Sequence, residues 1–353
     1  MRALTTIIFL FCLITQAISQ EKRISLLFAG DAMQHLPQIK GAMNADGTYN
    51  YDSCFYLIKD KIIKADLAGL NFETTLAGKP FTGYPTFSSP DEFAYSLKDA
   101  GFNLFFMANN HAVDKGLVGL ERTINLLDSI NIKHTGTFKS KESRELFYPL
   151  MIIKSGIRIA FINYTYATNG LKVPTPSIVN KIDTNQIKLD LLHTKLYKPD
   201  IIIAQMHWGE EYHTVPSSNQ KTLSNFLLKN GVKIIIGHHP HVVQSIQINK
   251  EGNLISSVTY YSLGNFISNQ QKINTDGGIF AEIVISKENA HSPVKIESAK
   301  HSLFWVEKKT VKNKVNYRLI PEDLINHSGL SEEDKAKMNI FLKSAKKILN
   351  HKL

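Results

Sequence analysis

The stretch Lys233-Ile234-Ile235-Ile236-Gly237-His238-His239-Pro240-His241 decides the fold, because a short apolar run ends in a glycine and three histidines. A brief β-branched run closed by turn residues predicts a buried strand. Four other apolar runs end in the same way, and each is closed by a short polar segment. The five runs are Ile24–Ala29, Asp66–Leu70, Leu104–Met107, Ile201–Met206 and Lys233–Ile236, closed in that order by Gly30-Asp31, Asn71-Phe72-Glu73, Asn109-Asn110-His111, His207 to Glu210, and Gly237 to His241. Since the carboxyl ends of parallel strands line one edge of an α/β sheet, we expect a functional site there.

Segments with apolar residues at helical spacing separate these runs. They are Asp52 to Lys64, Asp91 to Ala100, Gly116 to Ile130, Asp183 to Tyr197, and Ser217 to Asn230. This alternation predicts an α/β fold with a largely parallel sheet covered by helices on both faces.

Beyond Gly237 the pattern changes. The runs Val258–Ser262, Gly278–Ile285 and Val294–Glu297 have no helices between them, which predicts an antiparallel portion or a second sheet. A hairpin is expected from Leu146–Ile153 and Ile157–Asn163, and a loop at the rim of the site from Ala167 to Val179. We expect one catalytic domain over residues 24–300 and an appendage over residues 301–353, which ends in a basic helix from Ser331 to Leu349.

The first segment has the composition of a targeting sequence. Arg2 precedes a mostly apolar run that ends in small residues, so residues 1–19 predict a cleaved secretory signal, with a retained anchor as the alternative. The protein would then lie in the periplasm, in the cell envelope or outside the cell, with no transmembrane span after cleavage. Cleavage would leave Cys54 without a disulfide partner, and we give this thiol no role.

The formal net charge is +10, and the lysines are scattered with an excess near the C-terminus. This balance favours a surface that attracts an anionic polymer or a phosphorylated envelope substrate. No nucleic-acid-binding motif accompanies the charge, so nucleic acid is not an expected partner.

The polar segments carry the residue types that hydrolytic metals bind. Asp31 and Glu73 offer carboxylates, Asn110 an amide oxygen, and His207, His239 and His241 imidazoles. In an extended chain residues 239 and 241 would project to one side and His238 to the other. His111 could donate a proton to a leaving group instead of binding metal.

These segments, in this order, resemble the CapA family of bacterial poly-γ-glutamate capsule proteins, also called PgsA-like. The matching segments are Gly30 to Met33, Asn71 to Glu73, Ala108 to Gly116, His207 to Tyr212, Gly237 to Gln244, and Tyr261 to Phe266. The resemblance spans about residues 24–285, and the family looks like a branch of the calcineurin-like metallophosphoesterases.

The resemblance implies a metallophosphatase-like fold, in which two β-sheets pack face to face between outer helices in four layers (α/β/β/α). It also implies one or two divalent metal ions, either Mn, Fe or Zn. Glu73 would bridge the metals and also serve the catalysis, and Asn110, His207 and His239 would hold one of them. Asp31 and His241 would contribute to the other, and His111 would be the catalytic proton donor.

The chain departs from ordinary metallophosphoesterases at its first motif. An Asp-x-His sequence would be expected there, but Asp31-Ala32-Met33 stands in its place. One imidazole is therefore missing from the metal that Asp31 would bind. His35 lies two residues further on and is the candidate to replace it.

The sequence therefore predicts an exported metal-dependent hydrolase-like protein of capsule or extracellular anionic polymer biosynthesis. Water activated by the metal would attack phosphorus in a phosphoester, or the carbonyl carbon of an amide or ester in a poly-γ-glutamate-type chain. The alternative is a non-catalytic protein that binds the polymer during export. Either form could work with capsule synthesis or export machinery.

Overall fold

The computed structural model describes residues 21–311, 313–326 and 329–350. The predicted signal, residues 1–19, lies outside the described residues. Within the described ranges, no helix combines the length and the apolar content that a membrane crossing needs.

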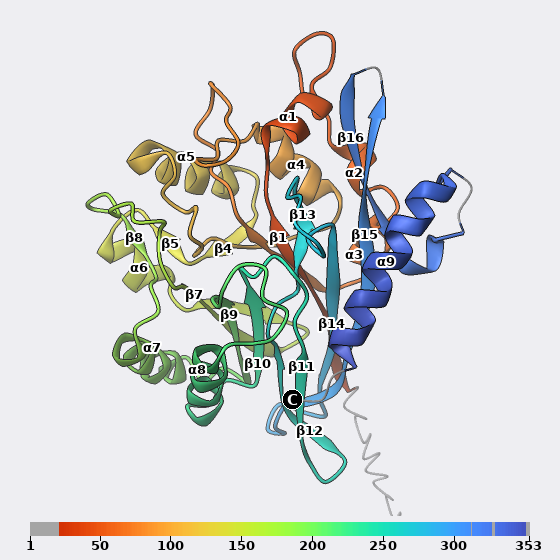
Figure 1. Cartoon of the computed structure of the whole chain (residues 1–353). Helices are drawn as coiled ribbons and strands as arrows, with labels where there is room; N and C mark the ends of the chain where they lie inside the picture. Colours follow the sequence, from red (N-terminus) through yellow and green to blue (C-terminus); the bar gives the residue numbers. More distant parts are fainter. Residues whose placement is uncertain (1–20, 312, 327–328, 351–353) are drawn as a thin grey trace, which may run out of the picture.

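The first three apolar runs form strands that lie side by side in one half of the structure (Figure 1). The strand order in this half is β4-β3-β2-β1-β14-β15, with β16 paired to β15. Strands β1 to β4 are parallel, whereas β14, β15 and β16 are antiparallel to their neighbours. The bounds are β1 (Lys22–Ala32), β2 (Leu67–Phe72), β3 (Leu104–Phe106), β4 (Lys133–Thr135), β14 (Gly277–Lys287), β15 (Lys295–Val311) and β16 (Lys314–Pro321).

The second half carries the other two runs. Its strand order is β12-β10-β9-β7-β6, with β11 paired to β12. Strands β7, β9, β10 and β12 are parallel, and β6 pairs antiparallel with β7 as the predicted hairpin. The bounds are β6 (Leu150–Lys154), β7 (Ile157–Thr165), β9 (Ile201–His207), β10 (Ile234–His238), β11 (Ile246–Glu251) and β12 (Leu254–Tyr260).

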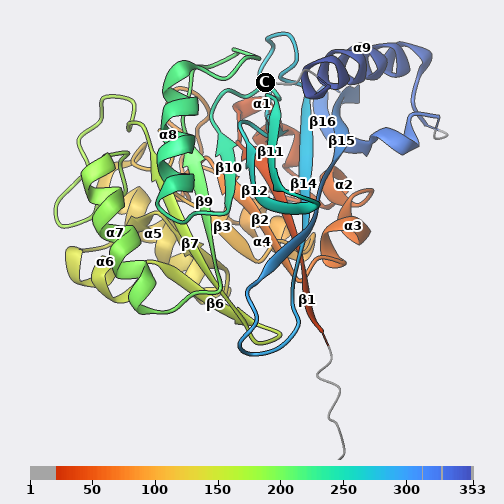
Figure 2. The same ribbon diagram turned by 90° about the horizontal axis from the view of Figure 1, so that it is seen from below.

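Three apolar clusters hold the layers together. The first lies between the two halves, where Phe161 of β7 meets Phe28 of β1 and Phe106 of β3 at ring-centroid distances of 6.4 and 5.9 Å. The second packs the outer face of the first half against α2, α3 and α4, and the third packs the outer face of the second half against α7 and α8. Figure 2 shows α7 and α8 on the opposite side of the strands from α2 and α3. The helix bounds are α1 (Leu36–Ala42), α2 (Asp52–Phe55), α3 (Lys59–Ile63), α4 (Asp91–Asp99), α5 (Gly116–Ser129), α6 (Lys141–Phe147), α7 (Thr184–Leu196), α8 (Ser218–Lys229) and α9 (Glu332–Leu349).

The predicted α/β/β/α layering is confirmed, with one difference. The bridge between Ile255 of β12 and Ile296 of β15 joins the two halves into a single hydrogen-bonded sheet of 14 strands among the described residues. Long antiparallel strands such as β15 can twist from one layer into the next, which is why two packed layers need not be two separate sheets.

The C-terminal segment is part of this core. Strand β15 continues across the predicted boundary at residue 300, and the expected basic helix is present as α9, capped by Ser331. Met338 and Phe341 of α9 are buried in the cluster between the halves. Residues after 300 therefore complete the sheet and its apolar core.

Candidate metal centre

The predicted residues meet where the two halves bring their carboxyl ends together. Asp31 ends β1, and Glu73 follows β2; His207 ends β9, and β10 leads into His239 and His241. All five side chains are at most 3 % exposed. Parallel pairing sets them level, because Asp31 is in register with Asn71 and His207 is in register with His238.

Glu73 lies at the centre of the group. Its Oε1 atom is buried and has no hydrogen-bond partner, 3.8 Å from His207 Nε2 and 3.9 Å from His241 Nε2. Burial raises the pKa of Glu73 well above its ordinary value, and the carboxylates of Asp31 and Glu211 raise it further. A buried acceptor without a donor is costly unless a proton or a cation satisfies it.

Asn71 organises the two carboxylates, a role that the sequence reasoning did not assign. Its Nδ2 atom donates to Asp31 Oδ1 at 2.8 Å and to Glu73 Oε2 at 3.0 Å. Asn109 Nδ2 donates in turn to Asn71 Oδ1 at 3.3 Å. The amide thereby occupies Oε2 and leaves Oε1 as the free oxygen of Glu73. The only sequence signal was the position of Asn71 at the end of the same strand.

We call the group formed by Asn110 and His207 the His207 side. His207 Nε2 lies 3.0 Å from Asn110 Oδ1 and 3.8 Å from Glu73 Oε1, so His207 stands between the two. Burial lowers the pKa of His207 well below its ordinary value, and the neighbouring histidines lower it further. The imidazole is therefore neutral at physiological pH, which is the form that binds metals.

We call the group formed by Asp31, His241 and Asn265 the His241 side. His241 Nδ1 lies 3.0 Å from Asp31 Oδ2 and 3.1 Å from Asn265 Oδ1. Both partners are acceptors, so Nδ1 carries a proton and, in the neutral ring, the lone pair is on Nε2. Such an outer hydrogen bond fixes the tautomer and the orientation of a metal-binding histidine. Burial acts to raise the pKa of Asp31, but the hydrogen bond and charge of His241 outweigh it, and the net shift is downward.

Asn265 is a second residue that the sequence reasoning quoted without a role. It pairs with Asp31 across β1 and β13 (Asn265–Ile267). Gly30 permits this close approach, since a Cβ atom at residue 30 would lie 1.9 Å from the backbone oxygen of Gly264. A glycine before the carboxylate is therefore required by the close packing of the backbone, within strand β1.

The distances group the candidate ligands in overlapping sets. Within each set the ligand atoms lie within 4.8 Å of one another, and the sets are Glu73 with His239 and His241, and Asp31 with Glu73 and His207. The resemblance instead places His239 with His207. The His239 ring lies between the two, at centroid distances of 4.8 Å from His207 and 5.7 Å from His241. Its Nδ1 atom is buried without a partner, and burial lowers its pKa to about 3.

The residue types fit a divalent cation. Neutral imidazoles, buried carboxylates and an amide oxygen converge, and two of the buried atoms, Glu73 Oε1 and His239 Nδ1, have no hydrogen-bond donor or acceptor among the described residues.

The backbone that carries these histidines differs from the prediction. His239 and His241 have φ values of 95° and 59°, so the segment is not extended after β10. Both are non-glycine residues in the left-handed region, which is strained and which is found mostly at functional sites. The two imidazoles reach one region because of these turns, and not because of strand alternation.

His238 also differs in part. Its side chain is in neither set of candidate ligands, but it does not point away from the site. Nδ1 lies 3.6 Å from Asp31 Oδ1, and Nε2 contacts Gln205 Oε1 at 3.0 Å. Because β10 ends at His238, the alternation of side chains along the strand fixes the orientation of His238 relative to Gly237 but not relative to His239.

His111 is held by a carboxylate that the sequence reasoning did not single out. Its Nδ1 atom lies 2.7 Å from Asp114 Oδ2, and the backbone N–H of Phe87 donates to the same oxygen at 2.6 Å. The spacing of three residues within one turn was the available signal. Asp114 fixes the ring and leaves Nε2 as the atom that can exchange a proton with a bound molecule.

His35 does not join either set of candidate ligands. The backbone N–H of Asn269 donates to its Nδ1 atom at 3.2 Å. The same nitrogen lies 3.2 Å from Gln38 Oε1, so Nδ1 is engaged by neighbours outside the centre. Burial lowers the pKa of His35 to about 4, which keeps the ring neutral.

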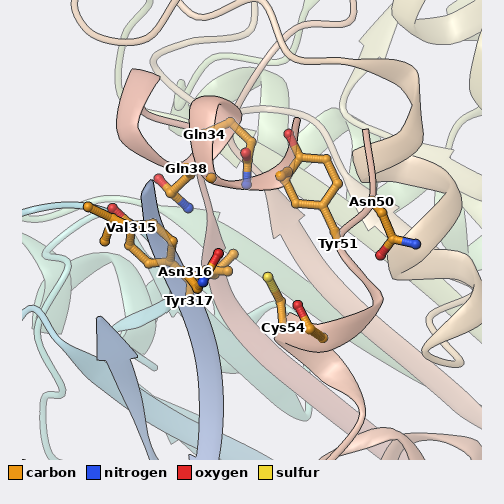
Figure 3. Close-up of a pocket in the computed structure, with 12 residues that line it drawn as sticks. Gln34, Gln38, Asn50, Tyr51, Cys54, Val315, Asn316 and Tyr317 are labelled. Atoms are coloured by element: carbon orange, nitrogen blue, oxygen red, sulfur yellow. The ribbon is translucent and has the colours of Figure 1, made fainter. Parts of the chain in front are cut away.

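A separate small pocket is lined by Cys54 (Figure 3). Its volume is about 20 Å³, and Gln34, Gln38 and Tyr51 surround it together with the thiol. This is room for about one water molecule and not for a substrate. Burial raises the pKa of Cys54 to about 12, so the thiol is not a nucleophile.

Comparison with known proteins places the chain in a family. Residues 25–270 match the family model described as bacterial capsule synthesis protein PGA_cap. The chain belongs to that family. The predicted resemblance to the CapA family is thereby confirmed.

Two relatives of this PGA_cap protein are capsule proteins by name. It is 28% identical over 263 residues to the capsule biosynthesis protein CapA of Bacillus anthracis, a match that covers 71% of this chain and 61% of that protein. It is 26% identical over 320 residues to the PGA biosynthesis protein CapA of Bacillus subtilis (strain 168), covering 85% of this chain and 78% of that protein.

Solved structures similar to this chain have low sequence identity to it. One is a phosphatase from Mycoplasma pneumoniae, with a TM-score of 0.47 and 17% identity over 80% of this chain and 94% of the other. Another is the NAD nucleotidase NadN of Haemophilus influenzae, with a TM-score of 0.49 and 15% identity over 92% of this chain and 63% of the other.

Proposed function

We propose that this PGA_cap protein is an exported metal-dependent hydrolase that acts on an anionic polymer of the capsule or cell envelope. One observation carries the proposal: Glu73 Oε1 is fully buried, has no hydrogen-bond partner, and faces Nε2 of both His207 and His241. A buried carboxylate oxygen without a donor is costly unless a proton or a cation satisfies it, and two imidazole nitrogens lie beside this one. The composition of residues 1–19 supports export.

A divalent cation bound among these residues would supply a Lewis acid and lower the pKa of a bound water. The residues of the chain hold the candidate metal-binding side chains in position. Asn71 orients Asp31 and Glu73, and Asp31 with Asn265 orients His241.

His111 would supply the proton. Asp114 accepts from Nδ1 and would stabilise the charged ring, so Nε2 can protonate the leaving group of the bond that is cleaved. The backbone N–H of Phe87 keeps Asp114 in place.

The class of substrate follows from the names of the relatives and from the charge. The relatives are named for capsule biosynthesis and PGA biosynthesis, and the net charge of +10 would attract a polyanion. The bond cleaved is an amide or ester in a poly-γ-glutamate-type chain, or else a phosphoester of an envelope substrate.

The test uses the full chain, first freed of metal by a chelator and then supplied separately with Mn²⁺, Zn²⁺ or Fe²⁺. Release of γ-linked glutamate fragments and hydrolysis of bis(p-nitrophenyl) phosphate are measured, with Glu73→Gln as the matched variant. We expect metal-dependent turnover of one of the two substrates, and loss of both metal and turnover in Glu73→Gln. Wild-type protein that binds no metal, or that turns over neither substrate with metal bound, would contradict the proposal.

A second function is favoured by Met33, which stands where an imidazole is expected. The protein would then bind the polymer during export without cleaving it. In that case poly-γ-glutamate would bind equally well to the wild type and to Glu73→Gln, with no fragments released.

A further inference from the structure

Glu211 is a candidate ligand that neither the predicted site nor the family resemblance includes. It follows β9 in the segment His207-Trp208-Gly209-Glu210-Glu211. The backbone N–H of Tyr212 donates to the carbonyl oxygen of Pro240 at 2.8 Å, which ties this turn to the residue between His239 and His241. Glu211 is thereby held beside the His241 side of the centre.

The contacts of His241 Nε2 are unusual. It lies 3.9 Å from Glu73 Oε1 and 3.9 Å from Glu211 Oε1, and neither distance is a hydrogen bond. Nδ1 already donates to Asp31 and Asn265, so a neutral ring has no proton to offer at Nε2. The donor-free Glu73 Oε1 atom and the nitrogen lone pair therefore face one another, with the Glu211 carboxylate beside them, an arrangement that a cation stabilises.

The charge of Glu211 also acts on this region. Burial is the main reason why the pKa of Glu73 is raised, and the Asp31 and Glu211 carboxylates add to it. The Glu211 side chain is 43% exposed, so it can adjust its position at small cost.

The resemblance implies that the missing imidazole belongs to the same side of the centre, because it would share a metal with Asp31. Met33 replaces this histidine, and His35 is in neither set of candidate ligands, with its Nδ1 atom in contact with Asn269 and Gln38. Glu211 is the further carboxylate that faces His241 on this side.

We propose that Glu211 supplies the ligand that Met33 does not, so that Glu73, Glu211 and His241 form an oxygen-rich cation position, with Asp31 orienting His241 from its other ring nitrogen. The inference rests on the proposed metal centre and deepens it. Two carboxylates with one imidazole suit Mn²⁺ or Mg²⁺, whereas Asn110 and His207 with Glu73, joined by His239 as the resemblance implies, suit Zn²⁺ or Fe²⁺. The two positions therefore prefer different metals.

The test is a titration of the chelator-treated full chain with Mn²⁺, in which the concentration of free Mn²⁺ is measured by electron paramagnetic resonance. Glu211→Gln is compared with Glu210→Gln, which removes the same charge from a neighbour whose carboxylate is 67% exposed and lies 3.6 Å from His213. We expect the wild type and Glu210→Gln each to bind two Mn²⁺ ions, with the same affinities in the variant as in the wild type. Glu211→Gln should weaken one of the two sites by about tenfold or more, in the range seen when residues around a metal are lost. Circular dichroism checks that each variant is folded.

A rescue separates a ligand from a residue that acts on substrate. Met33→His in the Glu211→Gln background should restore the second site, now with Zn²⁺ preferred over Mn²⁺. Equal Mn²⁺ binding in Glu211→Gln and Glu210→Gln would overturn the inference, even if turnover fell, and would leave the metal centre standing. Absence of metal binding in the wild type would overturn the proposed function as well.

Discussion

The His207 side and the His241 side share Glu73 but differ in donor chemistry and in access to solvent. On the His207 side the imidazole is fully buried and meets the amide oxygen of Asn110 at 3.0 Å. On the His241 side the imidazole is held by Asp31 and Asn265, and its other nitrogen faces the half-exposed Glu211. By the resemblance, the imidazole that Met33 replaces would belong to this second side. We therefore expect a nitrogen-rich position and an oxygen-rich one, with different metal preferences.

The largest effects are expected from removing one imidazole from each side. His207→Ala should abolish tight Zn²⁺ binding and keep a Mn²⁺ site, and His241→Ala should do the reverse. Each variant should lose more than about 100-fold in affinity at its own site, because a direct ligand matters more than the outer residues that cost 10–100-fold. Metal content after equilibration with each ion is measured by plasma mass spectrometry.

His193→Ala on α7 is the control for this pair, since its ring contacts Tyr197 and lies outside the candidate ligand sets. If His207→Ala and His241→Ala lost the same metal to the same extent, the two sides would not be distinct positions.

The next largest effect concerns turnover alone. His111→Ala should lower turnover by roughly 10²–10⁴-fold, as general-acid losses usually do, with metal content unchanged on both sides. Asp114→Asn should give a smaller loss, because the ring keeps its Nε2 atom but loses the carboxylate that fixes Nδ1. Metal loss in His111→Ala would make His111 a ligand and would remove it from the proton-donor role.

The sequence predicted the layers of the fold because their causes are local. Alternating strand and helix periods, such as those around Ile201–Met206 and Ser217 to Asn230, depend on residues close in the chain. The joining of the halves could not be predicted in this way. It depends on the bridge between Ile255 of β12 and Ile296 of β15, two residues that are distant in the sequence and that no local periodicity pairs.

The convergence of Asp31, Glu73 and His207 was predicted because strand ends alone bring these side chains together. Their binding of metal stays a prediction. The geometry of His239 and His241 was not predictable from strand alternation, because positive φ values redirect the chain after β10. Asn71, Asn265 and Glu211 were missed as participants because their contacts run between different strand ends. Asp114 was missed although its contact with His111 is local, three residues along one turn.

A smaller effect is expected where the missing imidazole is returned. Met33→His in the wild-type chain should make the His241 side more like the His207 side, since imidazole favours Zn²⁺ over Mn²⁺. Zn²⁺ affinity at the second site should rise by about tenfold, a gain of about 1.4 kcal/mol. Calorimetric titration measures it, with Met33→Leu as the size-matched control. An unchanged affinity would show that this position does not face the metal.

The smallest effect is expected from replacing His35, which we place outside both sides of the centre. Burial lowers the pKa of His35 to about 4 in the folded chain, against about 6.5 for an unfolded histidine. The folded state therefore holds the neutral ring, and its stability contribution is complete above about pH 6.5 and is lost as the pH falls towards about 4.

His35→Gln should reduce the acid-induced loss of stability of the metal-free protein between pH 7 and pH 4.5 by about 1–2 kcal/mol. Urea unfolding at the two pH values measures this difference, and metal content at pH 7 should match the wild type. An identical pH dependence would mean that His35 is not held neutral by burial, and a loss of metal would make it a ligand after all.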